Sequence, residues 1–163
     1  MKIALIAVGR LKSGPERELV ERYRTRIVAG ARALGFGPFE IIEITESRAR
    51  READRRAEEA RMILDRAGGA RLVLLDERGR SRSSPEFAAT LAGWRDDGVA
   101  RTAFVIGGPD GLDPALSHDA ALQIGFGALT LPHQLVRVLI AEQIYRALTI
   151  IGGHPYHRAG HGE

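Results

Sequence analysis

The sequence predicts one α/β domain in which a parallel sheet is flanked by helices, and two observations favour this class. Short apolar runs alternate with helical patterns along all 163 residues, as expected of repeated strand–helix–strand units. The runs at 72–75 and 102–106 are apolar at nearly every position, which is typical of parallel strands covered on both faces. No internal repeat or linker interrupts this order, so residues 1–163 are predicted to form a single domain.

The first half of the chain predicts two strand–helix units. The apolar run after Met1 predicts a strand, and Pro15 opens a helix whose apolar positions recur every four residues. The charged segment after the second strand predicts a solvated helix that ends at two glycines. The expected strands are 2–8 and 39–44, and the expected helices run from about 15 to the glycines at 35–37 and from 47 to 67.

The second half continues the same alternation. Ser83 or Ser84, followed by Pro85 and Glu86, is a helix start with a capping side chain and a first-turn proline. Between the third strand and this helix, residues 76–83 predict a polar loop. The expected strands are 72–75, 102–106 and a weak one at 122–125, and the expected helices are 84–97, a short one at 114–120 and a long one at 133–151.

The last predicted helix carries two apolar stripes. Twelve of its nineteen residues are apolar or tyrosine, with Arg137 on one side and Glu142, Arg146 and Thr149 on the other. A surface helix needs only one apolar stripe, so we expect this helix to pack on its own sheet and on a second copy of the chain. Its charged residues argue against a membrane span.

Composition excludes several kinds of chemistry. The chain has no cysteine, which removes disulfides, thiolate nucleophiles and sulfur-ligated metals. The apolar run at the amino terminus is too short for a signal peptide, so the protein is expected in the cytoplasm.

Of 24 basic residues only Lys2 and Lys12 are lysines. The arginines, which gather in the first two thirds, suit a polyanion, although genomic base composition explains the same bias. His154 and His157 lack a third ligand nearby, and we predict no metal.

The ligand site is predicted where three strands end. In open α/β sheets ligands bind beyond the carboxyl ends of the strands, here after Leu75, after Ile106 and around 126–132. The loop at 107–111 holds three glycines, which either form a tight turn or let a ligand approach bare backbone. The usual nucleotide-binding and hydrolase motifs are absent, and these loops offer no evident nucleophile. They are better suited to hold a reactive cofactor.

Several stretches resemble the RlmH-type SPOUT methyltransferases, bacterial enzymes that methylate N3 of a pseudouridine in large-subunit (23S) ribosomal RNA. The isolated GGPDG motif would be weak, but the order and spacing of all the motifs make the resemblance specific over nearly the whole length. The stretches are AVGRLK at 7–12, FVIGGPDGL at 104–112, LTLPHQLVRVL at 129–139, AEQIYRA at 141–147 and HPYHR at 154–158.

The resemblance implies a carboxy-terminal trefoil knot within about 102–158 and S-adenosyl-L-methionine bound in it. It also implies a homodimer formed through the C-terminal helix. By motif match the cofactor would contact Leu75, Gly107, Phe126, Gly127, Ala128, Leu129, Thr130 and Leu131.

The same resemblance suggests residues that assist or orient the target base. These are His133, Tyr156, His157 and Arg158, with Arg137 and Arg146 as anion binders or dimer contacts. Local packing explains His133 equally well, and an intrahelical pair with Glu142 explains Arg146 equally well.

The implied partner is ribosomal RNA in the ribosome or large subunit, because so small a chain has no separate RNA-binding domain. Two other functions stay open at this stage. One is a SPOUT methyltransferase acting on transfer RNA or on a ribose 2′-hydroxyl. The other is a non-catalytic dimer that binds RNA or the ribosome.

Overall fold

Five strands form one parallel sheet in the order β2-β1-β4-β3-β5. The computed structural model describes residues 1–156. Its strands are β1 (Lys2–Val8), β2 (Phe39–Ile44), β3 (Arg71–Arg80), β4 (Arg101–Ile106) and β5 (Ala120–Ile124). The predicted class, a parallel sheet flanked by helices, is confirmed.

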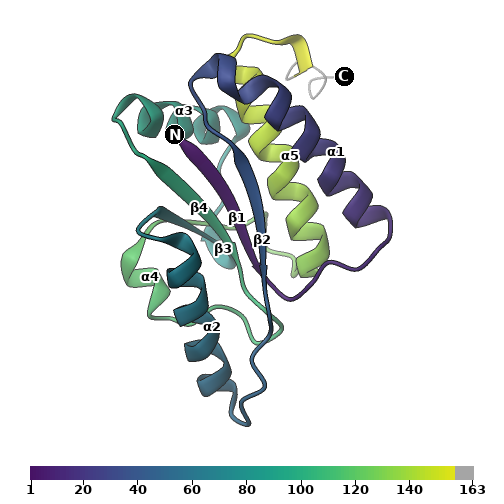
Figure 1. Ribbon diagram of the computed structural model, residues 1–163, viewed down its shortest axis with the longest axis vertical. Coiled ribbons are helices and arrows are strands. Elements are labelled where there is room, and N and C mark those ends of the chain that lie inside the picture. The colour runs from purple at the N-terminus through teal and green to yellow at the C-terminus, as the bar shows by residue number, and fades with distance from the viewer. Residues whose placement is uncertain (157–163) are drawn as a thin grey trace.

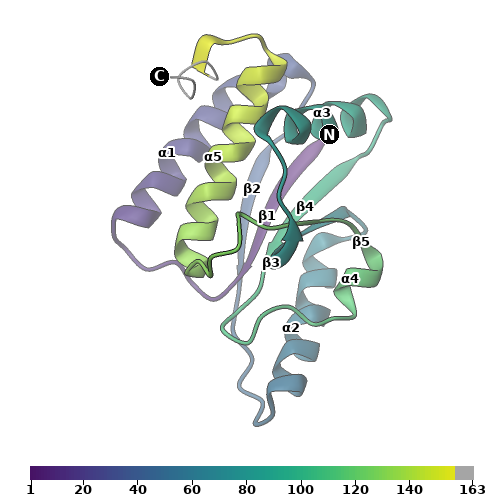
Figure 2. The same ribbon diagram turned by 180° about the vertical axis from the view of Figure 1, so that it is seen from behind.

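Helices cover both faces of the sheet (Figures 1 and 2). One face packs against α1 (Pro15–Ala31), α3 (Ser84–Asp96) and α5 (His133–Ile151), with the short 3-10 turn Arg32–Leu34 after α1. The other face packs against α2 (Glu52–Ala67) and the single-turn α4 (Leu116–Asp119). Because both faces are buried, β1 is apolar at every position after Lys2.

The predicted helix at 47–67 begins later than expected. Arg51 has an extended backbone, with φ −93° and ψ 140°, and α2 starts at Glu52. The Ser47 N–H donates to Glu59 Oε1 at 3.0 Å, so the chain before α2 turns back along the helix instead of extending it. The helix predicted at 114–120 is likewise shorter and covers only Leu116–Asp119.

Residues 76–80 form the largest departure from the prediction, which made them a polar loop. They continue β3 past its regular pairing, and Leu75 and Arg80 both pair with Ile124 of β5. The Gly125 N–H also donates to the Arg80 carbonyl at 3.3 Å. The chain between these two contacts therefore arcs around the end of β5.

Two glycines make this crossing possible. A Cβ on Gly79 would lie 2.4 Å from the Ile124 carbonyl carbon, and a Cβ on Gly125 would lie 2.7 Å from the Gly79 carbonyl oxygen. Both contacts are with backbone, which has no side-chain freedom to relieve them. The two chain segments can approach this closely only because neither residue carries a side chain.

The helix predicted at 133–151 is confirmed as α5. The structure covers much of its second apolar stripe within the chain, because α5 packs on α1 and α3 as well as on the sheet. Near its start, however, Leu135 is 43% exposed and Leu139 is 37% exposed. If a second copy packs on α5, the apolar surface available for it is therefore the smaller one at Leu135 and Leu139.

Arg137 lies inside the protein and is not available as an anion binder or a dimer contact. Its side chain is 2% exposed. The guanidinium donates to Glu43 Oε1 at 2.8 Å and to the carbonyls of Val8 and Gly9 at 3.0 and 2.8 Å. Burial lowers the pKa of Arg137, and the Glu43 carboxylate opposes that change. Arg137 thus fastens α5 to the end of β1.

We expect Gly79→Ala to lower the free energy of unfolding by about 3 kcal/mol, because the new Cβ meets backbone. Urea unfolding followed by circular dichroism measures this change. Gly93→Ala in α3 is the matched control: nothing lies within 4 Å of its Cβ, and it should stabilise the protein by about 0.5–1 kcal/mol. Equal unfolding midpoints for the two variants would show that the crossing at Gly79 can relax.

Candidate functional site

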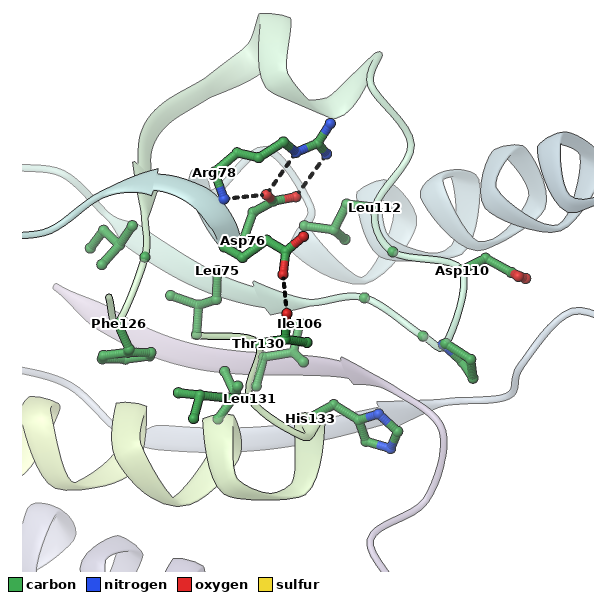
Figure 3. Close-up of a pocket in the computed structure, with 18 of the residues that line it drawn as sticks. Leu75, Asp76, Arg78, Ile106, Asp110, Leu112, Phe126, Thr130, Leu131 and His133 are labelled. Atoms are coloured by element: carbon green, nitrogen blue, oxygen red, sulfur yellow. Dashed lines mark hydrogen bonds and ion pairs between the residues drawn. The ribbon is translucent and has the colours of Figure 1, made fainter. Parts of the chain in front are cut away.

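A cleft of about 610 Å³ lies at the carboxyl ends of β3, β4 and β5. Its walls are the end of β3 at 76–78 and the loops at 107–114 and 125–131, which follow β4 and β5 (Figure 3). The volume lies within the range of about 300–1,000 Å³ that is typical of small-molecule sites. The position is the one predicted from the sequence for an open α/β sheet.

The inner surface of the cleft is mostly apolar. Leu75 and Ile106, at the ends of neighbouring strands, are only 7% and 3% exposed. Such walls suit a flat heterocycle, which gains from apolar contact and from hydrogen bonds to backbone. The apolar lining residues are Leu75, Ile106, Leu112, Ile124, Phe126, Leu129, Leu131 and Val136.

Seven of the eight predicted cofactor-contacting residues line this one cleft. Ala128 belongs to the same loop but is not among the lining residues. The structure therefore brings together positions that are more than fifty residues apart in the sequence. The seven are Leu75, Gly107, Phe126, Gly127, Leu129, Thr130 and Leu131.

The glycine-rich loop at 107–111 is folded tightly on itself. The Gly111 N–H donates to the Gly108 carbonyl at 2.9 Å, and Gly111 has φ +81°. A Cβ on Gly107 would lie 2.8 Å from the Gly111 carbonyl carbon and 3.0 Å from Leu112 Cγ. The same loop therefore forms the tight turn and lines the cleft with glycine backbone.

An ion pair holds this loop against α2, and a buried carboxylate of α2 lies beside it. Arg55 contacts Asp110 through two bonds, Nε to Oδ2 at 2.5 Å and Nη2 to Oδ1 at 3.0 Å. This pair lowers the pKa of Asp110. Glu59 is 4% exposed, and burial raises its pKa. The sequence predicted a solvated helix here, but Arg55 and Glu59 both face the loop.

The opposite wall carries polar side chains that the sequence did not single out. Asp76 accepts from the Arg78 guanidinium through both carboxylate oxygens at 3.0 Å and from the Arg78 N–H at 2.9 Å. The hydrogen bonds from Arg78 lower the pKa of Asp76. Glu77 accepts from the Thr130 hydroxyl at 3.0 Å (Figure 3). The sequence predicted residues 76–83 only as a polar loop between the third strand and the next helix.

The predicted catalytic residues do not gather in one place. His133, the first residue of α5, lines the cleft. Tyr156 follows the other end of α5, whose 19 residues span about 28 Å at 1.5 Å per residue. Figure 1 shows α5 running from the strand ends to the opposite end of the molecule. His157 and Arg158 lie outside the described residues.

Tyr156 belongs to a separate cluster of aromatic and charged side chains. Its hydroxyl donates to Glu142 Oε1 at 3.3 Å, and the Arg146 guanidinium lies 5.1 Å from the centre of its ring. Burial, with a hydrogen bond to Tyr23, raises the pKa of Tyr156 to about 12. At neutral pH the phenol therefore keeps its proton. Arg146 pairs with Glu142 at 2.8 Å, the intrahelical alternative considered above.

The described residues carry neither a metal-binding cluster nor a membrane-spanning helix. No three of their His, Asp and Glu side chains are grouped so as to hold a metal ion. Within residues 1–156, no helix has the length and apolar character needed to cross a membrane.

Sequence comparisons with known proteins identify the family of this chain. A family model described as "Predicted SPOUT methyltransferase" matches residues 1–157. A protein of Rhodopseudomonas palustris (strain HaA2), named "Ribosomal RNA large subunit methyltransferase H", is 60% identical over 161 residues, covering 98% of this chain and all of that protein. A protein of the same name from Bradyrhizobium sp. (strain ORS 278) is 57% identical over 98% of this chain and 99% of its own.

Among solved structures, a probable methyltransferase from Bordetella pertussis Tohama I aligns with 90% of this chain and 95% of its own, at 16% identity and a TM-score of 0.49.

The sequence matches assign this protein to the SPOUT class of methyltransferases. Its fold is a parallel α/β sheet with the ligand cleft at the strand ends. The chain belongs to the SPOUT methyltransferase family, within the group of its ribosomal RNA large subunit methyltransferase H relatives, and the resemblance found in the sequence is confirmed.

We expect Gly107→Val to abolish binding of S-adenosylmethionine, because its side chain would meet Gly111 and Leu112 and open the loop. Isothermal titration calorimetry measures binding, and far-UV circular dichroism checks folding. Gly30→Val in α1, where nothing lies within 4 Å of the Cβ, should leave the affinity unchanged. Retained binding by a folded Gly107→Val protein would show that this loop does not shape the cofactor site.

Proposed function

We propose that the protein is an S-adenosyl-L-methionine-dependent methyltransferase that methylates N3 of a pseudouridine in large-subunit (23S) ribosomal RNA. The observation that carries this proposal is the cleft at the strand ends, with its apolar walls and bare backbone. It occurs in a chain 60% identical to a protein named as a ribosomal RNA large subunit methyltransferase. We place the protein in the cytoplasm, acting on assembled ribosomes or large subunits.

The residues of the cleft fit this cofactor. Adenine would lie against Leu75, Ile106 and the loop at 126–131, where backbone groups are available for its ring nitrogens. Gly127 would leave the backbone of this loop open to the ligand, whereas the missing side chain of Gly107 lets the loop at 107–111 close on itself. When bound, S-adenosylmethionine supplies a methyl group already attached to a good leaving group, the sulfonium sulfur.

The protein's main task is therefore to orient the target nitrogen. Alignment of two reactants can contribute about 7–11 kcal/mol, whereas one general base typically contributes about 10²–10⁴-fold in rate. His133 lines the cleft and would orient the base or accept the imide proton. Tyr156, with its pKa raised to about 12, would act as a hydrogen-bond donor.

We also infer that the carboxy-terminal segment forms a trefoil knot within about 102–158. The arc of residues 76–79 around the end of β5 supports this inference, because Ile124 pairs with residues on both sides of the arc. The chain then continues from Ile124 through the cleft loop into α5. In this arrangement the cofactor site would lie between the knotted loops.

We further infer that the protein acts as a homodimer through α5. A single chain places Tyr156 at the far end of α5 from His133, so it does not bring the two residues to one substrate. The exposed Leu135 and Leu139 lie one turn apart next to the cleft. A second copy seated on these leucines with its α5 antiparallel would bring its own Tyr156 toward the first cleft.

We expect the purified protein to transfer a labelled methyl group from S-adenosylmethionine to 23S ribosomal RNA in ribosomes from a strain that lacks this gene. Mass spectrometry of the digested RNA should then find 3-methylpseudouridine. Gly107→Val supplies the negative control, and transfer RNA is the competing substrate. Methylation of transfer RNA or of a ribose 2′-hydroxyl would overturn the proposed substrate. Cofactor binding without any turnover would favour a non-catalytic RNA-binding dimer.

We expect Leu139→Glu to convert the dimer to a monomer, since it places a charge in the proposed apolar contact. Analytical ultracentrifugation measures the change, and methylation should fall with it while cofactor affinity is retained. Leu64→Glu is the matched control, because Leu64 in α2 is similarly exposed at 42%. A wild-type monomer, or an equal effect of both substitutions, would contradict an α5 interface.

A further inference from the structure

The cleft contains three carboxylates, and two of them are already neutralised. Asp110 is paired with Arg55 through two hydrogen bonds, and Asp76 is paired with Arg78 in the same way. Each pair brings a positive and a negative charge together, so neither contributes a net charge to a ligand in the cleft. Figure 3 shows the Asp76–Arg78 pair on one wall and Asp110 apart from it.

Glu77 is different from these two acids. No lysine or arginine among residues 1–156 lies within ion-pair distance of its carboxylate. Its bond within the described chain is from the neutral Thr130 hydroxyl, at 3.0 Å. Arg78 is its neighbour in the sequence, but Asp76 occupies that guanidinium. The segment 76–78 therefore carries a net charge of −1 at the cleft.

The other cation of the cleft does not cancel this charge. Arg56 lines the cleft on the side of the glycine-rich loop, and it is paired with Glu52 one turn earlier on α2. Among the three carboxylates of the cleft, Glu77 is the one that no arginine of the described chain neutralises, so its charge acts on a ligand. Its bond to Thr130 joins the 76–80 segment to the loop at 126–131, and these are two walls of the same cleft.

We propose that Glu77 selects the charge state of the ligand, by favouring the positively charged sulfonium of the methyl donor over the neutral thioether of the demethylated product. This proposal rests on the proposed function, because it assumes that S-adenosylmethionine occupies this cleft. The uncompensated carboxylate attracts a cation before transfer. After transfer the sulfur is neutral and that attraction is gone, which assists product exchange.

The expected size of the effect follows from the exposure of Glu77. Glu77 is exposed, and a charge that solvent screens gives a modest preference, about two- to fivefold in the ratio of the two dissociation constants. The adenosine and the amino-acid groups are common to both ligands. Their contacts therefore cancel in the ratio, which isolates the response to the charge on sulfur.

The test is the pair of dissociation constants for S-adenosylmethionine and S-adenosylhomocysteine, measured by calorimetry on the full-length protein. Glu77→Gln keeps the size of the side chain and an oxygen for the Thr130 hydroxyl. We expect it to weaken S-adenosylmethionine binding about two- to fivefold relative to S-adenosylhomocysteine. Raising the salt concentration should reduce the preference of the wild type and leave that of the variant unchanged.

Two further variants separate charge from other effects. Thr130→Val removes the hydrogen bond but keeps the carboxylate, so the ratio of the two constants should be retained. Asp65→Asn in α2 removes one negative charge outside the cleft and should also retain it. Thermal melts check that each variant is folded.

Three results would overturn the proposal. An equal loss of affinity for both ligands would make Glu77 a hydrogen-bond acceptor for a group that they share. A ratio that stays at the wild-type value, or one that shifts equally in Thr130→Val, would remove the role of its charge. Failure of the wild type to bind either ligand is a different outcome, because it would reject the proposed cofactor site itself.

Discussion

The cleft depends on one contact between two backbones, where residues 76–80 cross the end of β5. Gly79 and Gly125 allow this contact, since a Cβ on either would lie within 2.7 Å of main-chain atoms. The crossing fixes both walls that matter for the ligand: the segment that carries Asp76 and Glu77, and the loop that begins at Gly125. Apolar strand ends at Leu75 and Ile106 then close the inner side. The sheet thus supplies a rigid floor, and the crossing sets the distance between the walls.

The polar groups of the cleft divide into those that hold the protein together and those left for a ligand. Arg55 and Asp110 fasten the glycine-rich loop to α2, and Arg78 and Asp76 satisfy one another on the opposite wall. Glu77, Thr130 and His133 remain at the surface of the cleft. This division is consistent with a protein that positions an activated methyl donor, because positioning needs fixed walls and few reactive side chains.

Much of this arrangement could be predicted from the sequence, and what could not has a physical reason. Apolar runs and capping residues define most strands and helices because they report local burial and local hydrogen bonds. Leu75, Gly107 and the loop at 126–131 were expected to share a site, since they lie at the ends of strands of one parallel sheet.

The arc of 76–80 around β5 was not predicted, because a polar extension of a strand and a polar loop have the same local composition. Arg137 was misplaced because its partners, Val8, Gly9 and Glu43, are distant in the sequence. The separation of Tyr156 from His133 follows from the length of the helix predicted at 133–151, but the resemblance grouped the two residues without regard to that length.

The buried bond from Arg137 to Val8 joins residues 129 positions apart, and it has a consequence for the order in which the protein becomes functional. β1 is the first strand of the chain, and its end acquires this buried partner only when α5 has been made. α5 also carries His133 at the cleft. A nascent chain therefore has no complete cleft until α5 has been made and Arg137 has reached the end of β1.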